Sequence, residues 1–178
     1  MPRRVVCCLI LLLLAGCVPR LRAQEQNDPL SPDEVQQIRD NNIYPNVRVK
    51  LFLKFVQERI DALKQLADNA NADHRMSQIS DKLQEFTTLC DEMQDNMDSY
   101  DSNHADIRKA LKAVEEASAK WPDVLHALPK EANNDYAVDT ALNSAQTAHQ
   151  DAQQLATEQD IFFKVHPKLR HKNGSGPD

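Results

Sequence analysis

The chain has 178 residues and a formal net charge of -6, which suits a single domain with an acidic surface. Such a surface disfavours nucleic acid as a partner. Glycine occurs only at positions 16, 174 and 176, which excludes a glycine-rich phosphate loop from the body of the chain and argues against a strand-rich domain.

The N-terminus has the parts of an export signal. Arg3 and Arg4 form a basic region, and the apolar run VVCCLILLLLAG follows them. This run is shorter than the about 20 apolar residues that a membrane-spanning helix needs. We therefore expect a cleavable signal peptide rather than a permanent anchor.

Two cleavage sites compete at the end of this signal. Residues 14–17, LAGC, match a bacterial lipobox, in which Cys17 becomes the acylated first residue of the mature protein. The alternative is cleavage after Ala23. The first choice gives a signal peptide at 1–16 and a membrane-anchored lipoprotein of the cell envelope. The second gives a signal at 1–23 and a soluble periplasmic or secreted protein.

A polar tether, residues 17–30, precedes the first expected helix. Ser31 is placed as an N-cap, Pro32 as the first helical residue and Glu34 as the reciprocal cap, so this capping box predicts a short helix through about Asp40. Pro45 can begin the first long helix, which has one apolar face with spacings of 3 and 4. That face comprises Val49, Phe52, Val56, Ile60, Leu63, Ala67 and Ala70.

The second long helix follows a turn at residues 69–73, in which Asp73 can act as the cap. Its apolar seam alternates spacings of 3 and 4 without a break. The seam comprises Met76, Ile79, Leu83, Phe86, Cys90, Met93, Met97 and Tyr100. Cys90 is the one cysteine in the body of the chain, and its place in the seam predicts a buried hydrophobe rather than a reactive thiol.

A break at residues 101–106, with Ser102 or Asn103 as cap, separates the second helix from a third seam. Pro122 interrupts the third seam, but its spacing continues beyond that residue, so we expect one kinked helix or two shorter ones. The seam comprises Ile107, Leu111, Val114, Ser118, Trp121, Leu125 and Leu128.

The fourth segment, residues 134–165, is rich in alanine, and Pro167 ends it. Its expected seam comprises Val138, Leu142, Ala145, Ala148, Ala152, Leu155, Gln159 and Phe162. The residues that follow, 167–178, form a basic tail that we expect to be flexible. Its basic residues could contact anionic envelope polymers or lipid headgroups, or simply keep the protein soluble.

These segments predict an all-α protein, an elongated antiparallel bundle of about four long helices over residues 31–166. The alternative is a long helical hairpin that dimerises, so a homo-oligomer is a second expectation. Single-chain and dimeric bundles both bury the same seams.

Acidic residues supply the main metal-ligand candidates. Asp91, Asp95 and Asp98 share one helix face, and hard cations such as Ca²⁺ prefer oxygen ligands. The glycine and the final glutamate of an EF-hand loop are absent here, so a solvated acidic face is the expected reading. We predict no metal and no cofactor.

Two Asp-x-x-His pairs, Asp101 with His104 and Asp123 with His126, are the other candidates. Di-iron bundles use Glu-x-x-His pairs with further inward carboxylates, which the apolar seams do not offer. His149 and His166 have no partner pattern, and no serine or cysteine motif indicates a nucleophile. The sequence therefore predicts a protein that is not an enzyme.

The stretch NDPLSPDEVQQIRDNNIYPNVRVKLFLKFVQERIDAL, residues 27–63, resembles an uncharacterised family of exported helical proteins from Acidobacteria. The resemblance implies bacterial export and no assigned activity. Related chains place an Ala-Gln junction before the DPLSP segment, as Ala23 and Gln24 do here. Cys17 is a departure from that pattern.

We expect a non-enzymatic envelope protein, held near a membrane by Cys17 and acting through contacts with a protein partner that the sequence does not identify. One alternative is a metal- or ligand-binding periplasmic bundle. Another is a chaperone-like envelope protein that uses Met76, Met93 and Met97 as adaptable apolar surface, which requires those methionines to be exposed.

Overall fold

The computed structural model describes residues 28–129 and 134–170, and within these ranges the chain is helical without strands. The elements are α2 (Pro32–Asp40), α3 (Pro45–Asp68), α4 (Arg75–Ser102), α5 (Arg108–Ser118), α6 (Trp121–His126), α7 (Asp135–Val165) and the 3-10 helix η1 (Pro167–Leu169). The predicted all-α class is confirmed. The expected signal peptide, Cys17 and the end of the basic tail lie outside the described residues.

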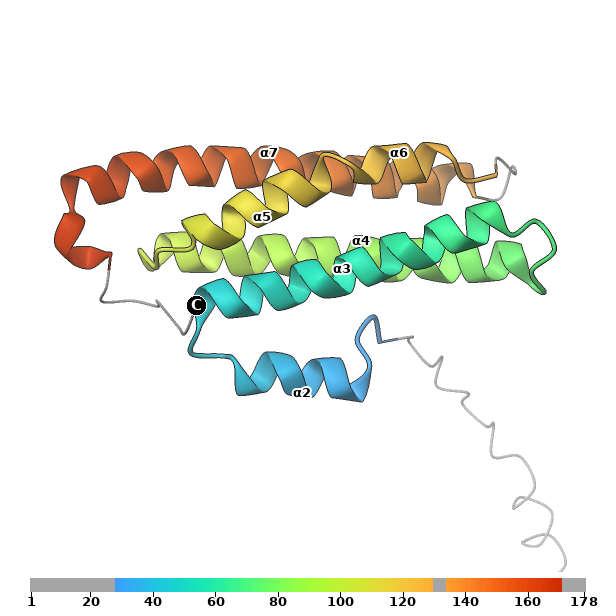
Figure 1. Ribbon diagram of the computed structural model, residues 1–178, viewed down its shortest axis with the longest axis horizontal. Helices are drawn as coiled ribbons and strands as arrows, with labels where there is room; N and C mark the ends of the chain where they lie inside the picture. Colours follow the sequence, from blue (N-terminus) through green and yellow to red (C-terminus); the bar gives the residue numbers. More distant parts are fainter. Residues whose placement is uncertain (1–27, 130–133, 171–178) are drawn as a thin grey trace, which may run out of the picture.

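The helices lie side by side in an elongated, bundle-like arrangement (Figure 1). α3 runs beside α4, the α5–α6 segment lies along α7, and α7 also packs against α4. α2 covers the outer side of α3, and η1 lies at the opposite end of α7 from α6 (Figure 1). No helix in the described ranges combines the length and apolarity that crossing a membrane requires.

The start of α2 follows directly from its sequence. The Ser31 amide donates to Glu34 Oε2 at 2.6 Å, and the Glu34 amide donates to Ser31 Oγ at 3.3 Å, which completes the predicted capping box. Pro32 is the first helical residue, where its missing N–H costs no hydrogen bond. Ile38 is buried and attaches α2 to the core.

The predicted seams of the second and third segments form much of the core. Along α4, every seam residue from Ile79 to Met97 is buried, while Met76 and Tyr100 at its ends are partly buried. Burial, with a smaller effect from Asp91, raises the pKa of the Cys90 thiol well above its usual value, as expected of a structural cysteine. Because Met93 and Met97 are fully buried, the seam offers little apolar surface to the unfolded proteins that a chaperone would bind.

All seven residues of the third seam are buried, although two helices share them. α5 ends at Ser118 and α6 begins at Trp121, because Pro122 has no N–H to donate and its ring would clash with the carbonyl four residues earlier. The Trp121 indole packs edge-on against Phe86 at a centroid distance of 5.5 Å and donates to Gln57 Oε1 at 3.1 Å. The break therefore preserves the register of the apolar face.

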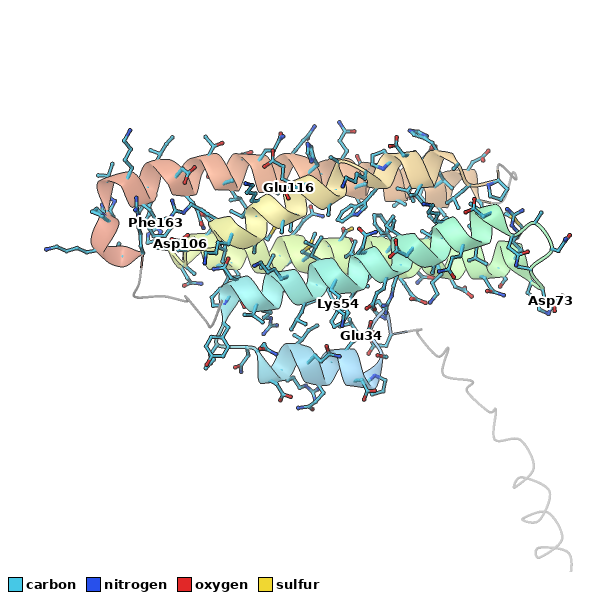
Figure 2. All side chains as sticks on the ribbon, viewed as in Figure 1. Glu34, Lys54, Asp73, Asp106, Glu116 and Phe163 are labelled. Atoms are coloured by element: carbon cyan, nitrogen blue, oxygen red, sulfur yellow. The ribbon has the colours of Figure 1, made fainter. Side chains whose placement is uncertain are left out.

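The expected helix caps at two turns are wrong. α4 begins after His74, whose φ is 51°, and Asp73 lies at the tip of the turn instead of capping the helix (Figure 2). Ser102 is the last residue of α4, and Asn103 follows it as the C-cap, so neither residue caps α5. In the first turn, Arg75 instead binds the carbonyls of Leu66 and Ala67 at the end of α3, at 2.6 and 2.7 Å.

The fourth seam differs from the prediction at its C-terminal end. Phe163, rather than Phe162, is fully buried, because the seam advances by four residues after Gln159 instead of three. Phe162 is half-buried and stacks between the rings of His104 and His166, at 4.4 and 4.6 Å. At the start of the segment, Val138 and Leu142 are only partly buried.

Candidate functional site

The three aspartates proposed from the sequence as a cation site form an exposed face of α4. Partial burial, followed by repulsion from Asp95, raises the pKa of both Asp91 and Asp98, and Asp101 adds to the effect at Asp98. The same causes raise the pKa of Asp151 on α7, where Asp98 is the neighbouring charge. In the described part of the chain, no three His, Cys, Asp or Glu side chains converge to hold a metal ion.

The two Asp-x-x-His pairs lie at opposite ends of the molecule. Asp101 lies in the last turn of α4 and His104 just after it, whereas Asp123 and His126 belong to α6, and α5 runs between the two pairs (Figure 1). Within the first pair, Asp101 accepts a hydrogen bond from Gln159 at 3.1 Å, while His104, with a φ of 55°, stacks on Phe162. The two pairs are therefore too far apart to share a dinuclear metal centre.

The connection between α4 and α5 is held by a buried side chain of α7. Gln159 is 2% exposed. Its Oε1 accepts from the Ile107 amide at 3.0 Å, and its Nε2 donates to the Ala105 carbonyl at 3.0 Å as well as to Asp101. The helix-period pattern places Gln159 on the buried face but does not reveal these partners, which are more than fifty residues away.

A second remote side chain, Asn46 of α3, binds backbone groups in the same connection between α4 and α5. Asn46 Nδ2 donates to the Asp106 carbonyl at 2.6 Å, and Asn46 Oδ1 accepts from the Ala110 amide at 3.0 Å. Asp106 also forms a paired contact with Arg108, whose Nη1 reaches Asp160 of α7 at 2.8 Å. The N-cap residue of α5, Ile107, has no capping side chain, so this helix start relies on Asp106, which accepts from the Arg108 amide at 3.4 Å, and on Asn46 and Gln159 from two other helices.

One serine lies close to a histidine, which the sequence analysis did not foresee. Ser118 Oγ and His149 Nδ1 are 3.0 Å apart, and both atoms lie near the Glu115 carbonyl oxygen, at 3.2 Å. The donor and acceptor roles of the His149 ring depend on its tautomer, whereas the Ser118 hydroxyl can donate to the Glu115 carbonyl, which only accepts. Ser118 is 1% exposed, so its hydroxyl is not accessible to a substrate, and the pair lies at the C-terminal end of α5.

A buried ion cluster attaches α2 to α3 and α4. The guanidinium of Arg59 binds both oxygens of Glu34, at 2.6 and 2.9 Å, the Pro29 carbonyl at 2.6 Å and Glu85 at 3.0 Å. Burial raises the pKa of Glu34, but hydrogen bonds from Arg59 and Ser31 outweigh it and lower that pKa to about 2. Arg59 therefore binds carboxylates of two different helices, and it keeps that of Glu34 in its charged form.

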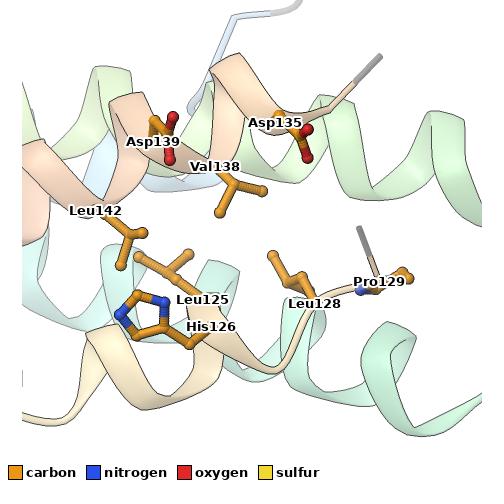
Figure 3. A pocket seen from close by; sticks show the side chains of 8 residues that line it. All are labelled: Leu125, His126, Leu128, Pro129, Asp135, Val138, Asp139 and Leu142. Carbon is orange, nitrogen blue, oxygen red and sulfur yellow. The ribbon is translucent and has the colours of Figure 1, made fainter. Parts of the chain in front are cut away.

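A groove of about 330 Å³ lies between α6 and the first turns of α7, and we call it the α6/α7 groove (Figure 3). Figure 3 shows the aliphatic side chains of Val138 and Leu142 facing Leu125 and Leu128 across it. The remaining lining residues are His126 and Pro129 on one side and Asp135 and Asp139 on the other. The groove thus combines aliphatic side chains with a histidine on the α6 side and two carboxylates on the α7 side.

Comparisons with protein-family models, with curated proteins and with solved structures found no match to this chain.

Proposed function

We propose that the protein is a non-enzymatic bacterial envelope protein, exported by its N-terminal signal, lipid-anchored through Cys17, and acting through contacts with other proteins. The observation that carries the non-enzymatic part is the engagement of its buried polar side chains. Gln159, Asn46 and the Ser118–His149 pair each hydrogen-bond to backbone groups at a helix end. A group already bound in this way is a support for the fold and not a free reactant.

We further propose that α3, α4, the α5–α6 segment and α7 form one antiparallel four-segment bundle within a single chain, rather than a hairpin that completes its core by dimerising. The burial of the α4 seam and of the third seam within one copy supports this arrangement. A hairpin would leave one of those seams exposed until a second copy covered it.

Lipid anchoring is tested by the intact mass of the mature protein from a bacterial host, with and without an inhibitor of the lipoprotein signal peptidase. We expect a product that begins at Cys17 and carries added acyl mass, and a precursor that accumulates with the inhibitor. Cys17→Ser is expected to abolish the modification, while Cys90→Ser leaves it unchanged. An unmodified product that begins at Gln24 would contradict the lipid anchor and show instead that the exported protein is soluble.

A second candidate function is cation binding by the acidic face of α4. The observation that favours it is the raised pKa of Asp91 and Asp98, since a bound cation would relieve the repulsion that contributes to both shifts. Elemental analysis of protein purified without a histidine tag tests it. Stoichiometric metal that Asp95→Asn removes would support this function, and a substoichiometric content would eliminate it.

A further inference from the structure

The α6/α7 groove has the chemistry of a site for an apolar segment that carries positive charge. Val138 and Leu142 offer partly exposed aliphatic surface over the buried Leu125 and Leu128, and Asp135 and Asp139 lie one helical turn apart on the α7 side of the groove. Apolar contacts in such a groove provide the binding surface, and the two carboxylates select for basic groups beside it.

The opposite end of α7 has the complementary properties. Ile161 and Val165, one turn apart, are 63% and 69% exposed and form a small apolar pair on the surface of α7. Lys164 lies between them in sequence, and Lys168 of η1 follows four positions later, both exposed. We call these four residues the basic end; its two lysines lie four positions apart in the sequence, one in α7 and one in η1, and oppose Asp135 and Asp139 in charge.

We propose that the basic end of one copy docks in the α6/α7 groove of a second copy. The proposal rests on the proposed role in protein contacts and names the partner, a second copy of this chain. Ile161 and Val165 would fill the apolar interior, while Lys164 and Lys168 would face Asp135 and Asp139 across its edge.

The two surfaces cannot meet within one molecule. They lie at the two ends of α7, where Ile161 follows Asp135 by 26 positions, which places them about 39 Å apart on one continuous helix. Figure 1 shows the α6 end and the η1 end of α7 at opposite ends of the molecule. Docking is therefore intermolecular and head-to-tail, and it generates a ring where the rotation between copies closes and an open filament where it does not.

Sedimentation velocity of the mature protein, measured over a concentration range that reaches about 1 mM, tests this inference. We expect concentration-dependent assembly that weakens with salt, because the paired charges lie at the solvent-exposed edge. The double variants Asp135→Lys/Asp139→Lys and Lys164→Glu/Lys168→Glu should each weaken assembly by at least about tenfold. An equimolar mixture of the two should assemble again, since each intact surface then finds its complement.

The matched controls make the same charge changes elsewhere. Asp91→Lys/Asp95→Lys reverses an exposed pair on α4 with the same spacing, and Lys50→Glu/Lys54→Glu does so on α3. Both controls should assemble like the wild type, and circular dichroism should show that all variants fold. The inference is wrong if the wild type stays monomeric throughout, if the controls weaken assembly equally, or if mixing restores nothing. Recovery of a monomeric protein bound to a different envelope protein would overturn the inference and leave the proposed function standing.

Discussion

At the scale of single residues, Gln159 shows how a polar side chain can occupy a core position without instability. Its neighbours on the buried face of α7 are Leu155 and Phe163, and a hydrophobe would fit the same pattern. The amide is retained there because it serves the Ile107 amide, the Ala105 carbonyl and Asp101 at once. Those backbone groups have no helical partner where α4 ends and α5 begins.

The substitution Gln159→Leu removes these hydrogen bonds while keeping most of the side-chain volume. We expect the free energy of unfolding to fall by about 2–4 kcal/mol, because two buried backbone groups lose their partner. Urea unfolding followed by circular dichroism measures the loss. The control is Gln153→Leu, two turns earlier, whose exposed amide binds only Glu115, and it should change stability by less than about 0.5 kcal/mol. Equal losses in the two variants would show that the buried amide is dispensable.

At the scale of elements, α2 is the helix whose attachment depends most on charge. It packs mainly against α3, and the contact between Arg59 and Glu34 lies at its N-terminal end. Because the pKa of Glu34 is lowered from 4.5 to about 2 in the folded protein, ionised Glu34 stabilises the fold above about pH 4.5. That contribution, at most about 3 kcal/mol, is lost as the pH falls toward 2.

Glu34→Gln is therefore expected to loosen α2 at neutral pH. Hydrogen exchange of the α2 amides should accelerate by roughly tenfold or more, and the free energy of unfolding should fall by about 2 kcal/mol. The difference from the wild type should shrink as the pH falls from about 4.5 toward 2, because the carboxylate is then protonated in the unfolded chain while it stays ionised in the folded protein until about pH 2. The matched control, Asp33→Asn, alters an exposed carboxylate in the same turn. A difference that is independent of pH would mean that Arg59 does not hold α2 through the charge of Glu34.

The elements themselves were largely predictable because their signals are local. The capping box at Ser31 and the third seam depend on residues three or four positions apart. The start of α3 depends on a single residue, Pro45. What could not be predicted depends on contacts between helices. Asn46 of α3 and His149 of α7 both bind backbone groups of α5. At the start of α5, Asn46 therefore takes the capping role that was expected of Ser102 or Asn103. At the end of α7, periodicity alone did not distinguish Phe162 from Phe163.

At the scale of the whole molecule, acidic charge opposes folding where it is concentrated. Partial burial and the Asp95 carboxylate raise the pKa of Asp91, Glu92 and Asp98, and at Glu92 the Asp28 carboxylate has a larger effect than Asp95. A carboxylate whose pKa is higher in the folded state than in the unfolded state destabilises the fold once it is ionised, so this part of the stability falls as the pH rises. Asp95 is the neighbour common to all three.

Asp95→Asn should therefore stabilise the protein at pH 7. We expect a gain of about 0.5 kcal/mol at low ionic strength, which disappears near 1 M salt because exposed charges are screened. Thermal unfolding at several salt concentrations measures this change. Asp73→Asn, at the exposed tip of the turn between α3 and α4, is the control and should show a smaller gain. A loss of stability in Asp95→Asn would indicate that Asp95 makes a favourable contact instead.

The position of the one tryptophan in the chain gives the molecule a built-in optical reporter. Trp121 is fully buried between Gln57 of α3 and Phe86 of α4, so its emission should be blue-shifted, resistant to iodide quenching and sensitive to any separation of these helices. α2 contributes no contact to this indole among those described. Trp121 fluorescence would consequently remain unchanged while α2 detaches. An unfolding curve followed by this fluorescence would report the separation of α3, α4 and α6, but not the detachment of α2.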